Sequence, residues 1–111
     1  MNVPLIDKLG GAKVLVTGDL MLDRYWSGPT NRVSPEAPVP VVKIDDEYQR
    51  LGGCGNVAAN ITALGGHAVL LSTMGDDDAA DAISRLAGQA AIECAFVRDE
   101  RAKTTVKLRV I

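Results

Sequence analysis

The sequence has few cysteines, few aromatic residues and a single histidine, and these shortages exclude several kinds of protein. Cys54 and Cys94 are the only two cysteines of the 111 residues, so neither a disulfide framework nor a zinc site is expected. No apolar run approaches the roughly 18 residues that a membrane-spanning helix needs. The first residues have neither a basic start nor an apolar stretch and do not form a secretory signal. We therefore expect a cytoplasmic protein with reduced thiols.

The chain also has no excess of basic residues. It carries 12 Lys and Arg against 14 Asp and Glu, and the two signs are spread evenly along the sequence. A nucleic-acid-binding surface would need a basic cluster, so no nucleic-acid partner is expected. With 47% hydrophobic and 23% charged residues, the composition is that of one ordinary globular domain.

Hydrophobic periodicity predicts alternating strands and helices. Residues 13–19, 68–73 and 91–97 form short apolar runs typical of strands in a parallel sheet. The first run does not alternate, which indicates burial on both faces. Apolar residues at helical spacing predict two helices between these strands: Val57, Ala58, Ile61 and Leu64, then Ala79, Ala82, Ile83 and Leu86. The order predicts an α/β fold with right-handed crossovers.

Two further segments differ from the rest of the chain in their composition or their pattern of apolar residues. Four of the five prolines lie between Pro29 and Pro40, so that stretch is expected to supply loops and edge strands, with residues 39–44 as the best strand. Residues 104–111 alternate apolar and basic side chains, which predicts a strand outside the central sheet. Because the sequence stops on Val110 and Ile111 within this strand, we expect the chain to be the front piece of a longer protein.

The glycine-rich segment from Gly52 to Asn56 is expected to form a loop before the first helix. Clustered glycines let backbone N–H groups approach a ligand, and a helix N-terminus favours anions or polar oxygens. The segment Gly53–Ala58 fits a loose G-x-G-x-x-A dinucleotide pattern only weakly, because residues 45–50 do not read as a buried strand. The alternative is a tight turn that only packs the helix.

Charged residues offer further candidates, each with a structural alternative. Asp23, like Asp19, follows the first strand and could bind sugar hydroxyls, or it could be a turn residue or a partner for Arg24. Lys107 and Arg109, with Lys43, could attract a phosphorylated ligand or simply form a solvated strand face.

Two other features favour a structural interpretation. The run Asp76–Asp78 is better explained by helix capping than by a metal site. Cys54 has no adjacent histidine or basic residue, which argues against a nucleophile.

Four motifs together carry a family resemblance. They are Gly18-Asp19-Leu20-Met21-Leu22-Asp23-Arg24-Tyr25-Trp26, the segment Gly52–Asn60 with Gly65 and Gly75, the run Ser34-Pro35-Glu36-Ala37-Pro38-Val39-Pro40-Val41-Val42, and Lys107-Leu108-Arg109-Val110. They resemble the ribokinase-like (phosphofructokinase-B) sugar kinases and, more narrowly, the heptose-7-phosphate kinase domain of bifunctional ADP-heptose synthases. The resemblance covers nearly the whole chain.

The resemblance implies a fold and a site. The fold would be a ribokinase-like parallel-sheet core with a small β lid, the core formed by residues 13–23 and 51–99 and the lid by residues 24–50 and 102–111. The substrate-binding residues would be Asp23, Gly52, Gly53, Asn56, Lys107 and Arg109. The family's Gly-Ala-Gly-Asp motif, which contains the catalytic base, is absent from the sequence. No catalytic or metal-binding residue is therefore assigned, and the ATP-binding part is expected to lie outside this chain.

The resemblance also implies an activity. The complete enzyme would use ATP and Mg²⁺ to phosphorylate the anomeric hydroxyl of D-glycero-D-manno-heptose 7-phosphate, in ADP-heptose and lipopolysaccharide core biosynthesis. A homodimer through the lid is expected, and the 111-residue chain alone is expected to be inactive and to bind neither ATP nor Mg²⁺. The alternatives are a ribokinase-like kinase for another sugar or nucleoside, or a non-catalytic module that dimerises through the lid.

Overall fold

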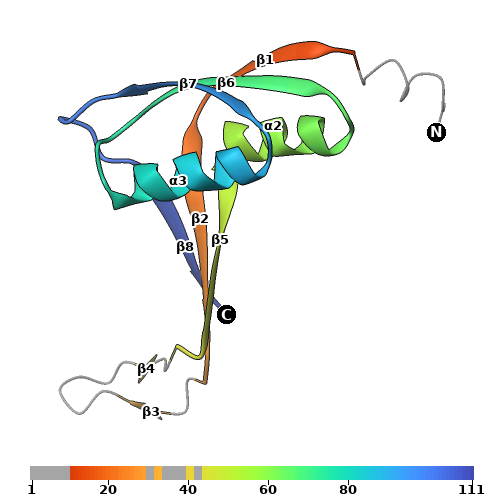
Figure 1. Ribbon diagram of the computed structural model, residues 1–111. Coiled ribbons are helices and arrows are strands. Elements are labelled where there is room, and N and C mark those ends of the chain that lie inside the picture. The colour runs from red at the N-terminus through yellow and green to blue at the C-terminus, as the bar shows by residue number, and fades with distance from the viewer. Residues whose placement is uncertain (1–10, 30–31, 34–39, 42–43) are drawn as a thin grey trace.

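A parallel sheet forms the core of the protein. The computed structural model describes residues 11–29, 32–33, 40–41 and 44–111 (Figure 1). Strands β1 (Lys13–Thr17), β6 (His67–Met74) and β7 (Glu93–Arg98) pair in parallel in the order β1-β6-β7. The crossovers contain helices α2 (Cys54–Ala63) and α3 (Asp78–Gln89), which confirms the predicted strand–helix alternation.

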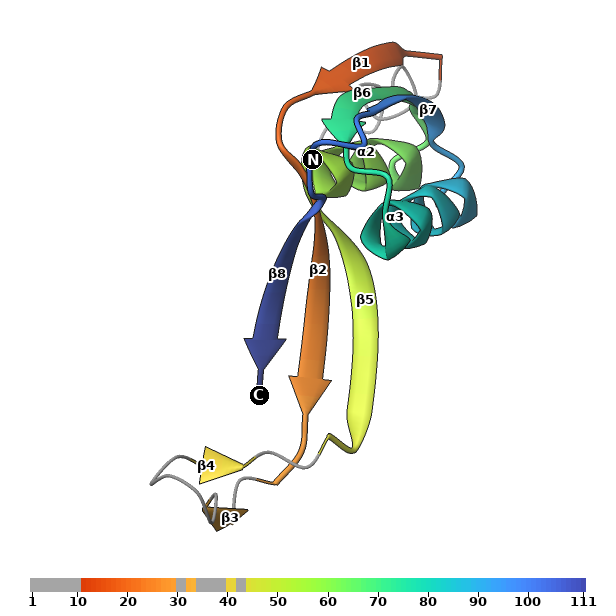
Figure 2. The same cartoon turned by 90° about the vertical axis from the view of Figure 1, so that its left-hand side faces the viewer.

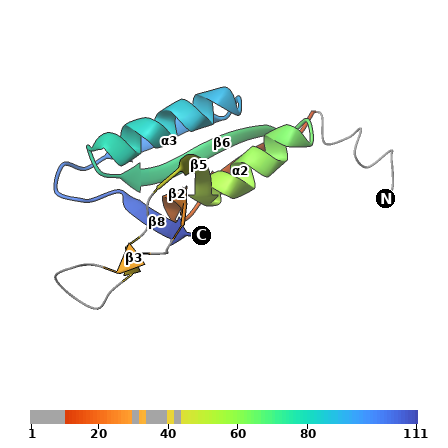
Figure 3. The ribbon, with the colours of Figure 1, turned by 90° about the horizontal axis from the view of Figure 1, so that it is seen from below.

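Both helices pack on the same face of this sheet (Figures 1 and 3). The strand residues that point toward them include Leu70, which is fully buried with Ile83 of α3. The opposite face is open within the part of the chain that the structure describes, and Leu15 on that face is 62% exposed. The expectation that the first strand is buried on both faces is therefore wrong, because these helices cover only one of them.

A second sheet projects from the core (Figure 2). Strand β2 (Leu20–Ser27) lies in its middle, antiparallel to β5 (Asp46–Gly53) and parallel to β8 (Thr105–Val110). Two short strands, β3 (Arg32–Val33) and β4 (Pro40–Val41), pair beyond the end of β2. The expected departure of residues 104–111 from the central sheet is confirmed, and the second sheet, called the lid sheet below, has the position of the expected lid.

The lid sheet begins earlier in the chain than the sequence indicated. Residues 20–23 are expected to belong to the core sheet, but their backbone pairs with β5 from Leu20 onward and with β8 from Met21 onward, while Leu20 and Leu22 still pack into the hydrophobic core. The predicted loop at residues 52–56 is also wrong, because Gly52 and Gly53 end β5 and α2 begins at Cys54. Of the expected strand at 39–44, the structure shows Pro40–Val41, while residues 39, 42 and 43 lie outside the described residues.

A glycine permits the direct change from strand β5 to helix α2. Gly53 has a φ of 58°, which lies in the left-handed region that favours glycine. The next amide, of Cys54, donates to the carbonyl oxygen of Asp19 over 2.8 Å. A Cβ atom on Gly53 would overlap that same oxygen. The strand can therefore turn into the helix only where no side chain is present.

Among the described residues, no helix has the length and apolar character needed to cross a membrane.

Replacing Gly53 with alanine should lower the free energy of unfolding by more than about 2 kcal/mol, since the substitution combines a strained φ with a steric overlap. Urea denaturation measures the change. Gly88→Ala is the matched control, because Gly88 lies in helix α3 with open space around its Cα and should gain roughly 0.5–1 kcal/mol. An unchanged stability of Gly53→Ala would contradict the assigned turn.

Candidate functional site

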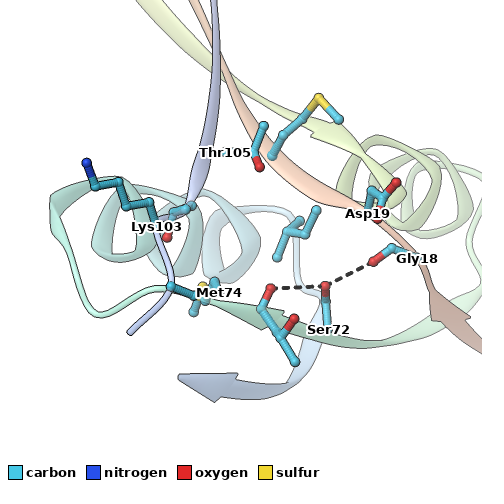
Figure 4. Close-up of a pocket in the computed structure, with 11 residues that line it drawn as sticks. Gly18, Asp19, Ser72, Met74, Lys103 and Thr105 are labelled. Carbon is cyan, nitrogen blue, oxygen red and sulfur yellow. Dashed lines mark hydrogen bonds between the residues drawn. The ribbon is translucent and has the colours of Figure 1, made fainter. Parts of the chain in front are cut away.

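A pocket of about 380 Å³ lies where the core meets the lid sheet (Figure 4). It is formed by the residues after β1, the end of β6 and the first residues of β2 and β8. Its lining residues are Gly18, Asp19, Leu20, Met21, Ser72, Thr73, Met74, Ala102, Lys103, Thr104 and Thr105. The Ser72 hydroxyl donates to the carbonyl oxygen of Gly18 over 3.0 Å and links the two core strands. Open α/β sheets bind ligands beyond the carboxyl ends of their strands, which is where this pocket lies.

One face of the lid sheet begins at the pocket. Met21 and Thr105 are cross-strand neighbours at the pocket, and the next pair along the same face is Asp23 and Lys107. On the other side of β2, Asp23 is opposite Arg50. Alternate residues of a strand share a face, so Asp23, Arg50 and Lys107 form one row beside the pocket. We call this surface the Asp23 face.

Asp23 has unused capacity to accept hydrogen bonds. Its side chain is 14% exposed, and its Oδ1 atom lies 3.3 Å from the Lys107 ammonium without a hydrogen bond to any described residue. A Cβ atom on the facing Gly52 would approach Oδ1 to 2.5 Å, so glycine is needed to leave room for the carboxylate. A partly buried carboxylate that has one neighbouring cation but no hydrogen bond at Oδ1 is suited to accept hydrogen bonds from a ligand's hydroxyl groups.

Arg24 is not the partner of Asp23. It lies on the opposite face of the lid sheet, where its guanidinium Nε is 3.5 Å from Oε1 of Glu47. The alternative explanation of Asp23 as the partner of Arg24 is therefore wrong.

The other predicted site residues do not all lie on the Asp23 face. Arg109 lies on the Asp23 face, one row beyond Lys107 and opposite Tyr25. Gly53 is the cross-strand partner of Leu20, so by the alternation of the strand it does not belong to the Asp23 face, although a Cβ atom on it would lie 3.3 Å from the end of the Met21 side chain. Asn56 is not among the lining residues of the pocket between the core and the lid sheet, and it lines a shallow hollow with Gln49, Arg50, Leu51, Ala59 and Leu86. The structure thus brings Asp23, Gly52 and Lys107 together, with Arg109 nearby, but not Asn56.

Three residues of this face were missed in the sequence. The rings of Tyr25 and Tyr48 stack with their centroids 4.7 Å apart, and the Arg50 guanidinium lies 5.9 and 5.3 Å from those centroids. The alternation of Tyr48, Arg50 and Gly52 in residues 46–53 was a usable signal. The signal is obscured because the segment begins with the two acidic residues Asp46 and Glu47 and does not resemble a buried strand.

The carboxylate of Asp77 fixes the start of strand β8. Its Oδ1 accepts from the Ala80 amide over 2.9 Å, which confirms the predicted helix cap, and its Oδ2 accepts from the Thr104 amide over 2.9 Å. The Thr104 hydroxyl in turn accepts from the Gly75 amide over 3.0 Å. The hydrogen bonds made to Asp77 itself, first those from Thr104 and then that from the Ala80 amide, hold the pKa of Asp77 below its usual value. One carboxylate therefore joins the first turn of α3 to the lid strand that carries Lys107.

Neither a metal centre nor a reactive thiol is present among the described residues. No group of three or more His, Cys, Asp or Glu side chains there could hold a metal ion. Burial raises the pKa of the Cys54 thiol, so the thiol stays protonated near neutral pH.

Comparison with known proteins places the chain in a family. Residues 12–111 match the family described as pfkB family carbohydrate kinase. The chain belongs to this family. The bifunctional protein HldE of Aeromonas salmonicida is 54% identical over 106 residues, which are 96% of this chain and 22% of that protein. The pfkB match thus covers nearly the whole chain, whereas the chain spans about a fifth of the length of this curated relative.

Solved structures show the same fold at low sequence identity. A carbohydrate kinase from Agrobacterium tumefaciens has a TM-score of 0.71 and 21% identity over 90% of this chain and 31% of its own. A fructokinase with bound ATP from Xylella fastidiosa has a TM-score of 0.68 and 22% identity over 89% of this chain and 29% of its own. The predicted ribokinase-like α/β fold, with a parallel core and a small lid, is confirmed.

Replacing Asp77 with alanine should lower the free energy of unfolding at pH 7 by about 1–2 kcal/mol, because the helix loses its cap and the Thr104 amide loses its acceptor. A carboxylate whose pKa is lowered by folding contributes stability above its unfolded pKa of about 4 and loses it as pH falls through the folded value. The difference between wild type and Asp77→Ala should therefore shrink below about pH 4.

Chemical denaturation across a pH series measures this effect. Asp78→Ala is the control, since Asp78 lies in the same helical turn without a described hydrogen bond to β8. A difference that stays constant down to low pH would show that the charge of Asp77 is not the stabilising feature.

Proposed function

We propose that this chain is the sugar-binding part of a carbohydrate kinase that phosphorylates the anomeric hydroxyl of D-glycero-D-manno-heptose 7-phosphate with ATP. The observation that carries the proposal is the Asp23 carboxylate, which has acceptor capacity to spare beside a pocket at the carboxyl ends of the core strands. The similarity to a bifunctional protein HldE supports the choice of a heptose. The activity would serve ADP-heptose and lipopolysaccharide core synthesis in the cytoplasm.

In the proposed mechanism, the residues of this chain bind and orient the sugar. The Asp23 carboxylate accepts hydrogen bonds from two hydroxyl groups, and Gly52 leaves the room that the carboxylate itself occupies. Lys107, 3.3 Å from Asp23, is placed to bind the same ligand. Such fixed contacts help to hold the accepting hydroxyl in a reactive position.

The remaining parts of the reaction are proposed to lie outside the described residues. Phosphoryl transfer needs positive charge around the γ-phosphate and a group that accepts the hydroxyl proton. ATP and Mg²⁺, which supply the phosphoryl group and neutralise its charge, would be bound by other parts of the complete kinase. The 111-residue chain alone should therefore not turn over ATP.

We also propose that the face of the lid sheet opposite Asp23 forms a homodimer interface. Val106, Leu108 and Val110 of β8 lie on that face and are 39%, 44% and 51% exposed. Strand β8 is at an edge of the lid sheet, and edges with exposed apolar side chains favour pairing with another chain. A two-fold interface would cover this surface and leave the Asp23 face accessible.

Asp23→Ala in the complete kinase should reduce kcat/KM for heptose 7-phosphate by at least tenfold and leave the KM for ATP nearly unchanged. The reason is the loss of hydrogen bonds to a charged acceptor, each worth about 1.5–3 kcal/mol. Steady-state kinetics with each substrate varied in turn measures both parameters.

Asp99→Ala is the control for Asp23→Ala, because Asp99 pairs with Arg101 in the loop before β8. Normal heptose kinetics in Asp23→Ala would refute the sugar-binding role. A wild-type preference for ribose, fructose 6-phosphate or adenosine would instead identify a kinase for another substrate.

Leu108→Lys should dissociate the dimer, because it places a charge in the proposed apolar interface. Lys107→Ala should leave the dimer intact, since that side chain lies on the other face of the strand. Sedimentation velocity at tens of micromolar distinguishes the species. A wild-type chain that stays monomeric under these conditions rules out the interface.

A further inference from the structure

The Asp23 face carries more positive charge than its own acidic groups balance. Asp23 is within ion-pair distance of Lys107, which leaves Arg50 and Arg109 on the same face. Neither guanidinium has an acidic partner within 4.0 Å among the described residues. The two rows that contain Asp23 and Tyr25 therefore hold a net charge of about +2, which is the opposite of the charge on a phosphate monoester at neutral pH.

Arg50 is an exposed arginine, but two aromatic rings lie close enough to restrain its guanidinium. Its guanidinium lies within 6 Å of both ring centroids of the stacked pair Tyr25 and Tyr48. A cation over an aromatic ring is attracted to it modestly at an exposed site, and this attraction leaves its charge uncompensated. The tyrosine pair thus holds the charge in place without neutralising it.

The position of Arg50 relative to Asp23 also fits a single ligand. The two residues are direct cross-strand neighbours, and neighbouring strands are about 4.8 Å apart. A sugar whose hydroxyls bind Asp23 would therefore extend over this row, and a charged group on it would reach Arg50 or Arg109. Guanidinium groups bind phosphate through two parallel hydrogen bonds, which a lysine cannot make.

We propose that Arg50, held by Tyr25 and Tyr48, binds the phosphate group of the sugar substrate and makes the kinase specific for phosphorylated sugars. This inference rests on the proposed function for its substrate and adds a specificity-determining residue to it. Arg109 contributes a second positive charge from the opposite edge strand. Tyr25 and Tyr48 are positioning residues, since they act through the guanidinium.

Arg50→Gln in the complete kinase tests the proposal. The ratio of kcat/KM for heptose 7-phosphate to that for the unphosphorylated heptose should fall by about 10- to 100-fold, the effect of one lost charged contact. The value for the unphosphorylated sugar should stay constant. Arg24→Gln is the matched control, because Arg24 belongs to the same sheet but lies on its opposite face.

Two further variants separate recognition from folding. Arg50→Lys keeps the charge but loses the planar fork, so it should restore only part of the ratio. Tyr48→Leu removes one ring from beneath the guanidinium and should lower the ratio in the same direction by a smaller factor. An equal loss for both sugars, or an unchanged ratio in Arg50→Gln, would overturn the proposal.

Inorganic phosphate provides a test that does not depend on the heptose assignment. Phosphate added at constant ionic strength should change the near-ultraviolet spectrum of the stacked tyrosines in wild type and in Arg24→Gln, but not in Arg50→Gln. If the kinase phosphorylates no heptose, the proposed function fails, and this titration still decides the inference. A spectrum insensitive to phosphate, or a response retained by Arg50→Gln, counts against it.

Discussion

The lid sheet depends on hydrogen bonds that fix the points at which its strands leave the core. The Cys54 amide donates to the Asp19 carbonyl, which ties the end of β5 to the start of β2. The Asp77 carboxylate accepts from the Thr104 amide and ties the start of β8 to the first turn of α3. These bonds set where the three strands start or end next to one another, so the placement of Asp23, Arg50 and Lys107 in one row follows from them.

Strand β2 connects core stability to the proposed binding of the sugar. Its first half contributes Leu20 and the fully buried Leu22 to the hydrophobic core, and Asp23 is the next residue along the chain. Successive side chains of a strand point to opposite faces, so anchoring Leu22 in the core directs Asp23 to the other side. A shift of one residue in register would bury the carboxylate and expose the leucine. The hydrophobic core therefore enforces the orientation of the carboxylate.

The sequence predicts local elements better than it predicts long-range contacts. The periodicity of residues 57–64 and 79–86 located both helices, and the alternation of residues 104–111 placed that strand outside the core. The direct passage from β5 into α2 was missed, because a glycine cluster is equally compatible with a loop. The bond from Thr104 to Asp77 spans 27 residues, and no local pattern indicates it. The Tyr25–Tyr48 stack likewise requires a strand register that the sequence does not specify.

The alternation within β8 lets one short strand serve two proposed roles. Lys107 and Arg109 face the Asp23 row, while Val106, Leu108 and Val110 face away from it. Because the period of a strand is two residues, neither set can move to the other face without exchanging both. If a second subunit packs on the apolar side, it restrains the strand that presents the cations to the substrate. The proposed dimer would then reduce the conformational freedom lost when the substrate binds, without contacting the substrate itself.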